Sequence, residues 1–268
     1  MLKDITLGQY YPIDSLIHKL DPRIKIISIV LVIIAVFFCK SPAAFALIAV
    51  FNIFVIFLSK IKFSIVLRAI RPVIFLIIFT GIINIFLTGG EQYIIRWKFI
   101  SITYEGVYSA LMMAARIILL VTFTSLLTFT TSPIRLTDGI ESMLKPFSKI
   151  GFPSHELAMM MTIALRFIPT LLEETDKIIM AQKSRGADFE SGNLIKRAKS
   201  LIPILVPLFI NSFKRADELA TAMECRCYRG GENRTKLKEL SISIGDFISL
   251  LVVVVIMIII ILFGVYGI

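Results

Sequence analysis

Residues 247–268 read FISLLVVVVIMIIIILFGVYGI, a run of 22 residues without a charged side chain. A helix needs about 20 consecutive apolar residues to cross the hydrocarbon core of a bilayer. Four more apolar runs precede this one along the chain, at residues 26–38, 43–58, 73–88 and 107–131. The sequence therefore predicts an all-α, polytopic membrane protein with about five transmembrane helices.

The overall composition supports this prediction. Apolar residues make up 57% of the chain, against roughly 45–50% in soluble domains. The formal net charge is +10, and in membrane proteins lysine and arginine collect in the cytoplasmic loops for reasons of topology. We therefore expect the chain to contact the lipid bilayer and not nucleic acid.

The basic residues also predict the topology. One basic cluster precedes the first apolar run and another follows the second, and both can be cytoplasmic only if the chain crosses the membrane twice between them. The clusters are Lys3, Lys19, Arg23 and Lys25, and then Lys60, Lys62, Arg68 and Arg71. We expect a multi-pass protein of the cytoplasmic membrane, with the N-terminus in the cytoplasm.

The region from residue 132 to residue 240 differs from the apolar runs. It holds 17 of the 29 lysines and arginines. Its two apolar stretches, residues 157–172 and 201–213, are short and contain charge or proline, which argues against membrane spans. The expected parts are a cytoplasmic N-terminal segment (residues 1–25), four spans (26–131), a cytoplasmic domain of two long helices (132–240) and a final span (241–268).

Two stripes of mostly apolar residues run through the cytoplasmic domain, with spacings that alternate between four and three. This spacing places each stripe on one face of a helix. The first stripe is Leu157, Met161, Ala164, Ile168, Leu171, Thr175, Ile178, Gln182 and Arg185, and the second is Leu205, Phe209, Ser212, Ala216, Leu219, Met223 and Arg226. Each stripe ends in an arginine, and the first predicts a helix from about residue 154 to residue 185.

A terminal arginine has two explanations. A cation near a helix C-terminus complements the macrodipole, which contributes about 0.3–1 kcal/mol. Alternatively, the guanidinium is an interface anchor, because its five donors engage carboxylates or carbonyls bidentately. The shared phase of Arg185 and Arg226 in two similar stripes favours the second explanation. The two tips would then insert into similar grooves on a pair of partner subunits.

Short motifs surround these arginines, and a further motif lies near the N-terminus. They are Arg166-Phe167-Ile168-Pro169, Ala181-Gln182-x-x-Arg185-Gly186, Pro207-Leu208, Arg215-Ala216 with Ala222-Met223-x-x-Arg226, and Asp21-Pro22-Arg23-x-Lys25. Together they resemble the transmembrane proteins of energy-coupling factor transporters, the EcfT/CbiQ family. The resemblance covers nearly the whole chain.

The resemblance implies a division of labour among several proteins. Two ABC-type ATPases would bind the helix tips through Arg185 and Arg226, and a separate small membrane protein, the S component, would capture a vitamin or other micronutrient. At both tips the family usually has Ala-Arg-Gly. This chain has Ser184-Arg185-Gly186 and Cys225-Arg226-Cys227, which keeps the flanking residues small.

The sequence contains no phosphate-binding loop of the type Gly-x-x-x-x-Gly-Lys-Ser/Thr, so ATP hydrolysis would come from partners. We expect no enzyme activity, no cofactor and no metal site in this chain. Two alternatives remain: the same role in a dedicated cobalt or nickel uptake system, and a stand-alone secondary transporter. Arg116 lies within the fourth apolar run, where it would pair with an acid or a helix end, or extend toward the surface.

Overall fold

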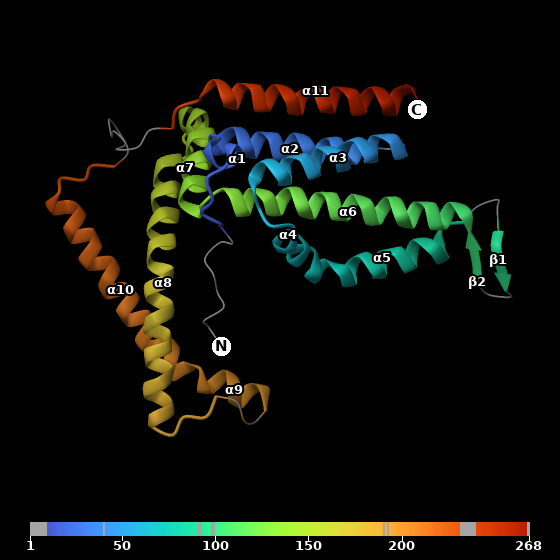
Figure 1. The fold of residues 1–268 in the computed structure, drawn as a ribbon. Coiled ribbons are helices and arrows are strands. Elements are labelled where there is room, and N and C mark those ends of the chain that lie inside the picture. Colours follow the sequence, from blue (N-terminus) through green and yellow to red (C-terminus); the bar gives the residue numbers. More distant parts are fainter. Residues whose placement is uncertain are drawn as a thin grey trace. The chain divides into compact units, whose positions relative to one another are not determined.

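The computed structural model describes residues 10–39, 41–89, 93–97, 100–189, 191, 193–230 and 240–266. Across these residues the chain is helical apart from one two-stranded hairpin (Figure 1). Contacts divide it into two compact units. We call residues 8–139 with 240–268 the bundle unit and residues 140–239 the crossed-helix unit.

The bundle unit contains the predicted membrane helices. Its helices are α1 (Leu16–Lys19), α2 (Pro22–Phe38), α3 (Pro42–Ser59), α4 (Phe63–Ile70), α5 (Ile74–Leu87), α6 (Tyr104–Thr130) and α11 (Ile244–Tyr266). Local capping sets where several of them begin. The Asp21 and Ser41 side chains accept N–H groups of the first turns of α2 and α3, and proline follows each of them, as helix starts prefer.

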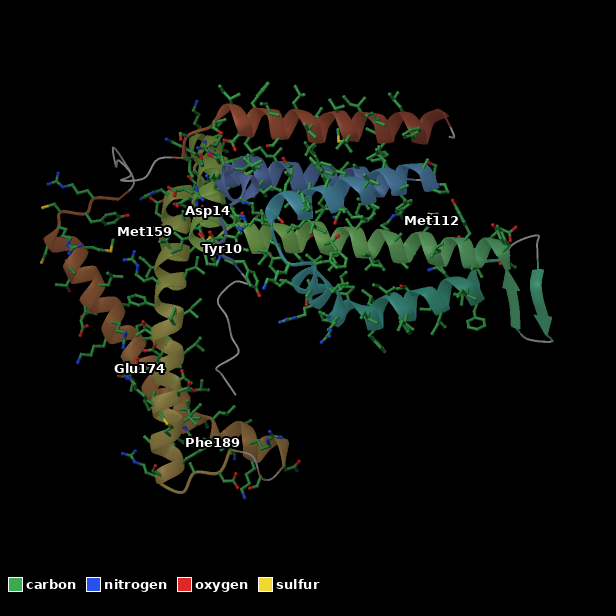
Figure 2. All side chains as sticks on the ribbon, in the orientation of Figure 1. Tyr10, Asp14, Met112, Met159, Glu174 and Phe189 are labelled. Carbon is green, nitrogen blue, oxygen red and sulfur yellow. The ribbon has the colours of Figure 1, made fainter. Side chains whose placement is uncertain are left out.

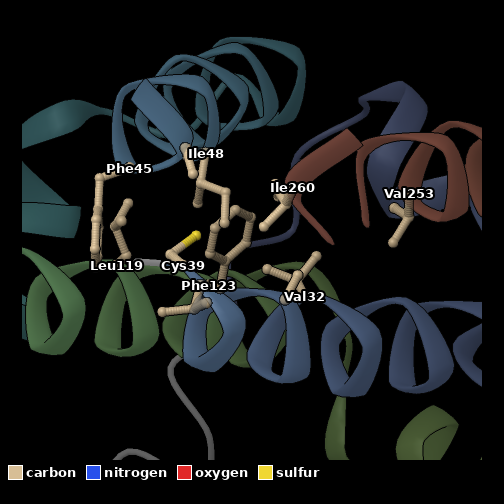
Figure 3. Close-up of a cluster of buried hydrophobic side chains, with 11 residues drawn as sticks. Val32, Cys39, Phe45, Ile48, Leu119, Phe123, Val253 and Ile260 are labelled. Atoms are coloured by element: carbon tan, nitrogen blue, oxygen red, sulfur yellow. The ribbon is translucent and has the colours of Figure 1, made fainter. Parts of the chain in front are cut away.

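The core of the bundle unit lies where α2, α3, α6 and α11 meet, and Figure 3 shows its labelled side chains. Val36, Cys39 and Ile260 are fully buried there. One polar contact crosses the same region, because the Asn52 side chain donates to the Thr122 hydroxyl at 3.0 Å. Asparagines within apolar runs are expected to form hydrogen bonds between helices, and Asn52 confirms this. The same expectation for Asn84 is wrong, because its side chain donates to a carbonyl of its own helix.

Arg116 of α6 contacts a helix end, which was one of the alternatives left open by the sequence. Its Nη2 donates to the Cys39 carbonyl at 3.0 Å, and Cys39 is the C-cap residue of α2. The guanidinium also lies 5.7 Å from the centre of the Phe45 ring. The cation therefore satisfies the negative end of a helix within the bundle.

Two features of the bundle unit differ from the sequence prediction. Helical structure begins at Phe63, ten residues before the predicted third run, because η1 (Arg71–Val73) joins α4 to α5 through Pro72. Proline is tolerated at the start of a helical turn, where its missing N–H has no partner to lose. In addition, β1 (Tyr93–Trp97) pairs antiparallel with β2 (Ile100–Thr103), a short hairpin that the all-α prediction did not include.

Five helices in the described part of the chain are long and apolar enough to cross a membrane. They are Pro42–Ser59, Phe63–Leu87, Tyr104–Thr130, Ser154–Ser184 and Ile244–Phe263. Four of them coincide with predicted spans. The fifth is α8, which meets the criterion although the sequence analysis placed it in the cytoplasm. Conversely, α2 has 17 residues, fewer than the usual 20, and its assignment as a span remains a prediction.

The crossed-helix unit is built on α8 (Ser154–Ser184) and α10 (Ile202–Cys225), with the short α9 (Leu194–Ser200) between them. The last turns of α7 (Pro133–Leu144) and η2 (Lys145–Ile150) precede α8. At 1.5 Å per residue α8 is about 46 Å long. The predicted helix over residues 154–185 is confirmed to within one residue at each end. The second predicted stripe, Leu205 to Arg226, lies on α10 and its C-cap residue.

Candidate functional site

Helix α8 ends at the arginine that the sequence singled out. Arg185 is its C-cap residue, and Gly186 follows with a φ of +83°. The Gly186 N–H donates to the Lys183 carbonyl and the Ala187 N–H donates to the Gln182 carbonyl, each at 3.0 Å. These two bonds form a Schellman motif, which satisfies the last carbonyls of a helix. Glycine suits this place because L side chains rarely adopt a positive φ.

Helix α10 ends in the same way. Arg226 is its C-cap residue, and Cys227 follows with a φ of +57°. The Cys227 N–H donates to the Glu224 carbonyl at 2.8 Å, and the Tyr228 N–H donates to the Met223 carbonyl at 3.1 Å. The two helices therefore share one C-terminal motif with an arginine at the same position in it.

The two arginines also match in backbone and exposure. Their φ and ψ angles are −87° and 6° at Arg185, and −91° and 14° at Arg226. Both residues are exposed, and neither guanidinium has a hydrogen bond or ion pair to any residue that the structure describes. Each guanidinium can therefore bind an external acceptor without first losing an internal one.

Small residues surround both tips. Ser184, Cys225 and Cys227 are exposed; the Ser184 hydroxyl donates to a carbonyl of its own helix, and the two cysteines are free thiols. Ala181 and Ala222, one turn before the arginines, are exposed as well. These short side chains leave the guanidinium as the longest group at each helix end.

The crossing of α8 and α10 is fixed by a polar cluster. Glu174 of α8, labelled in Figure 2, accepts hydrogen bonds from Asn211 and from Arg215, whose Nη2 lies 3.0 Å from Oε2 of Glu174. Near the end of α8, Gln182 donates weakly to the carbonyl of Pro203, at the start of α10. Since the C-terminal part of α8 meets the N-terminal part of α10, the helices run antiparallel and their arginine tips point to opposite ends of the pair (Figure 1).

We expect Glu174 and Arg215 to be energetically coupled. The Arg215 side chain is 37% exposed, so solvent screening limits the pair to about 1 kcal/mol. A double-mutant cycle of Glu174→Ala and Arg215→Ala, measured by denaturant titration of the full-length protein in detergent, should give this coupling energy. The matched cycle with Lys214→Ala, at the exposed neighbouring lysine, should give a value near zero. Equal values in both cycles would contradict the assigned contact.

The N-terminal motif forms a second polar cluster, within the bundle unit. The Asp21 N–H donates to Oδ1 of Asp246 at 2.7 Å, and the Arg23 Nη2 donates to the carbonyl of Leu240 at 2.7 Å. Pro22 packs against Gly139 of α7, where an added Cβ would lie only 3.1 Å from the proline ring. The motif therefore joins the starts of α2 and α11, which are more than 200 residues apart in the sequence.

Lys25 connects this cluster to the end of α6. It is 6% exposed, and its Nζ donates to the Thr130 carbonyl at 3.0 Å and to the Thr131 hydroxyl at 3.2 Å. Nearby, burial lowers the pKa of His18 below its usual 6.5, so its imidazole is neutral at pH 7. The ring nitrogens then pair with the Ser15 hydroxyl and the Tyr11 carbonyl.

Comparisons with known proteins agree with the motifs. The sequence model of the CbiQ family, described as cobalt transport protein, matches residues 14–237. The energy-coupling factor transporter transmembrane protein EcfT of Clostridium kluyveri is 58% identical over 252 residues, which cover 94% of this chain and 93% of that protein. The chain belongs to the EcfT/CbiQ family. The EcfT of Acidaminococcus fermentans is 55% identical over 253 residues, 94% of each chain.

Other residues of the EcfT/CbiQ motifs lie along the two long helices. Arg166 and Pro169 are exposed on α8, and Pro207 is half-buried within α10. A proline inside a helix leaves one carbonyl of the preceding turn without its N–H partner and bends the helix. Met223 lines a small surface hollow with Phe167 of α8. The two prolines affect the course of the helices, and Met223 packs between them, whereas Arg185 and Arg226 lie at the helix ends.

The presence of cysteine at the left-handed position after Arg226 has an energetic consequence. A left-handed backbone costs an L residue roughly 1 kcal/mol or more relative to glycine. We therefore expect Cys227→Gly to stabilise the end of α10 by about 1 kcal/mol. Hydrogen exchange of the Cys227 and Tyr228 amides should slow in this variant. Cys225→Ala, a change at a regular helical position, is the control and should leave exchange unchanged. If the two variants had the same amide exchange rates, the backbone at Cys227 would not be strained.

The sequence analysis missed two acidic residues of these clusters. Asp246 lies one residue before the uncharged run 247–268. Ser243-x-x-Asp246 resembles a capping box, with the carboxylate accepting the Ser243 N–H at 2.7 Å. That motif was a usable signal. Glu174 could have been sought as the acid facing the motif residue Arg215. No group of three or more His, Cys, Asp or Glu that could hold a metal occurs among the described residues.

Proposed function

We propose that this chain is the transmembrane coupling component of an energy-coupling factor importer. Two partner ABC-type ATPases bind the ends of α8 and α10 through Arg185 and Arg226. A separate small membrane protein, the S component, captures the vitamin or other micronutrient. The chain hydrolyses no ATP itself; it transmits the closure of the ATPases to the capture protein.

The observation that carries this proposal is the matched pair of helix ends. Two exposed arginines occupy the same C-cap position of two Schellman motifs, at opposite ends of an antiparallel helix pair. Two helix ends of the same geometry are expected to bind two similar partner sites, so a pair of similar ATPase subunits is the simplest partner. The relatives are named as components of energy-coupling factor transporters, which agrees with a multisubunit complex.

The proposal places the crossed-helix unit on the cytoplasmic side of the cell membrane, with a cytoplasmic N-terminus. Helix α8 is apolar enough to be a span by composition, but it contains seven charged residues. They are Glu156, Arg166, Glu173, Glu174, Asp176, Lys177 and Lys183. Each would be costly in the hydrocarbon core. The exposed apolar side chains Met160, Met161 and Phe209 then face the bilayer surface or the S component.

Mass spectrometry of the proteins that co-purify with this chain from gently solubilised membranes tests the proposal. We expect ABC-type ATPases and a small membrane protein. A chain that purifies alone and transports solute in vesicles, driven by an ion gradient, would contradict the proposal and support a secondary transporter. A second candidate is a dedicated cobalt or nickel system, because the matching family is described by cobalt transport; the ligand of the co-purified membrane protein decides between them.

A further inference from the structure

A groove of about 540 Å³ opens on the surface of the bundle unit. Its walls come from α1, α2, α3, α6 and α11, so it belongs to the packed end of the bundle. The volume falls within the roughly 300–1,000 Å³ of small-molecule sites. None of the interactions described above accounts for this space.

The charged groups of the groove lie at one end, and the hydroxyls of Ser28 and Ser249 lie further along it. Lys19, Lys25 and Ser243 line it beside the N-terminal cluster, and Val32, Phe123 and Val253 line its deep end. Every lining residue between them from α3 and α6 is apolar except Thr130, which is close to the cluster. Two lysines and no acidic residue occur among the lining residues. The groove thus has a cationic mouth and apolar walls.

The length of the groove matches one leaflet of a bilayer. From Ser243 to Val253 along α11 is ten residues, or about 15 Å at 1.5 Å per residue. Half of the roughly 30 Å hydrocarbon core is also about 15 Å. The length of the groove therefore suits an occupant that reaches from one membrane surface to the centre of the bilayer.

We propose that this groove binds one acyl chain of an anionic phospholipid, with the headgroup phosphate beside Lys19. Lys19 is exposed at the mouth, and its ammonium is available to an anion. The charge of the buried Lys25 is offset by the nearby buried carboxylates of Asp21 and Asp246, so Lys19 is the group that selects the anion. Basic residues at the end of a groove between membrane helices are a general means of selecting anionic lipids. The lipid would then fill the space between α11 and its neighbours.

Native mass spectrometry of the full-length protein tests this proposal, with phosphatidylglycerol and phosphatidylcholine of the same acyl chains as probes. We expect phosphatidylglycerol to bind more tightly. Lys19→Gln should weaken its binding about five-fold, as one lysine near an anionic surface predicts, and should leave phosphatidylcholine unchanged. Lys214→Gln removes an exposed lysine of the crossed-helix unit, which contributes no residue to the groove, and should change neither affinity.

A second pair of variants tests the apolar part of the site. Val252 lines the groove, so Val252→Trp should exclude both lipids, whereas Val255→Trp, at an exposed residue of the same helix outside the groove, should not. Equal binding of the two lipids by the unmodified protein would overturn the proposal, and so would unchanged phosphatidylglycerol binding in Val252→Trp. If Val252→Trp instead releases a co-purifying membrane protein and leaves lipid bound, the groove is a protein contact and the proposal is wrong.

Discussion

Replacing both Arg185 and Arg226 by alanine is expected to abolish co-purification of the partner ATPases. A buried arginine at the centre of an interface typically contributes 2 kcal/mol or more, which corresponds to about 30-fold or more in affinity for each site. With both tips removed we expect a loss of at least about 100-fold, measured by quantitative pull-down with the tagged chain. Each single variant should retain part of the binding, because the other helix end is intact.

The controls for this experiment separate docking from folding. Arg197→Ala removes an exposed arginine from the same unit and should leave ATPase recovery unchanged. Arg185→Lys keeps the charge but loses the planar pair of donors, so it should bind more weakly than the unmodified chain. Normal ATPase recovery with the double variant would contradict the docking role. Loss of recovery with Arg197→Ala would show that the effect is not specific to the tips.

The largest effect on stability is expected from Asp246→Ala. Asp246 is 1% exposed and accepts the Asp21 N–H, the Ser243 N–H and the Ser243 hydroxyl. The substitution leaves the buried Asp21 N–H without its acceptor and removes the carboxylate that accepts the Ser243 N–H just before α11. We expect a loss of about 3 kcal/mol in the free energy of unfolding, measured by denaturant titration of the full-length protein in detergent.

Asp14→Ala provides the matched control for Asp246→Ala. Asp14, labelled in Figure 2, is an exposed acid of the N-terminal segment, and its removal should change stability by no more than about 0.5 kcal/mol. Asp246→Asn keeps one acceptor oxygen and should fall between the two. If Asp246→Ala proved as stable as Asp14→Ala, the contact between the starts of α2 and α11 would have no energetic importance.

The membrane helices were largely predictable because their signal is local. An uncharged run such as residues 247–268 has few alternatives to a spanning helix, and α11 begins three residues earlier. Where local signals were mixed, the prediction was less accurate. Pro72 set the predicted start of the third run at residue 73, although helical structure begins at Phe63. Helix α8 contains both charged and apolar residues. It is apolar enough to span a membrane by composition, and its apolar residues also form the single stripe expected of a surface helix.

The arginine tips were predictable because the periodicity of a helix fixes which residue comes next on a face. The phase of the two stripes placed Arg185 and Arg226 at the helix ends, and both are C-cap residues. The acceptors of long-range contacts were not predictable in this way. That Arg116 contacts the Cys39 carbonyl depends on which helices pack together, and that information is absent from the local spacing of residues.

The location of the two helix ends is the central claim, and the native cysteines allow a direct test. Cys225 and Cys227 flank Arg226 and are exposed, while Cys39 is buried. In cells that express this chain without the partner ATPases, which would otherwise cover these residues, a membrane-impermeant maleimide should label Cys225 and Cys227 in inside-out vesicles. It should label neither in intact cells, with Cys39 unmodified in both. Labelling of these two cysteines from outside the cell, or only after detergent is added, would show that the end of α10 does not reach the cytoplasm and would contradict the account.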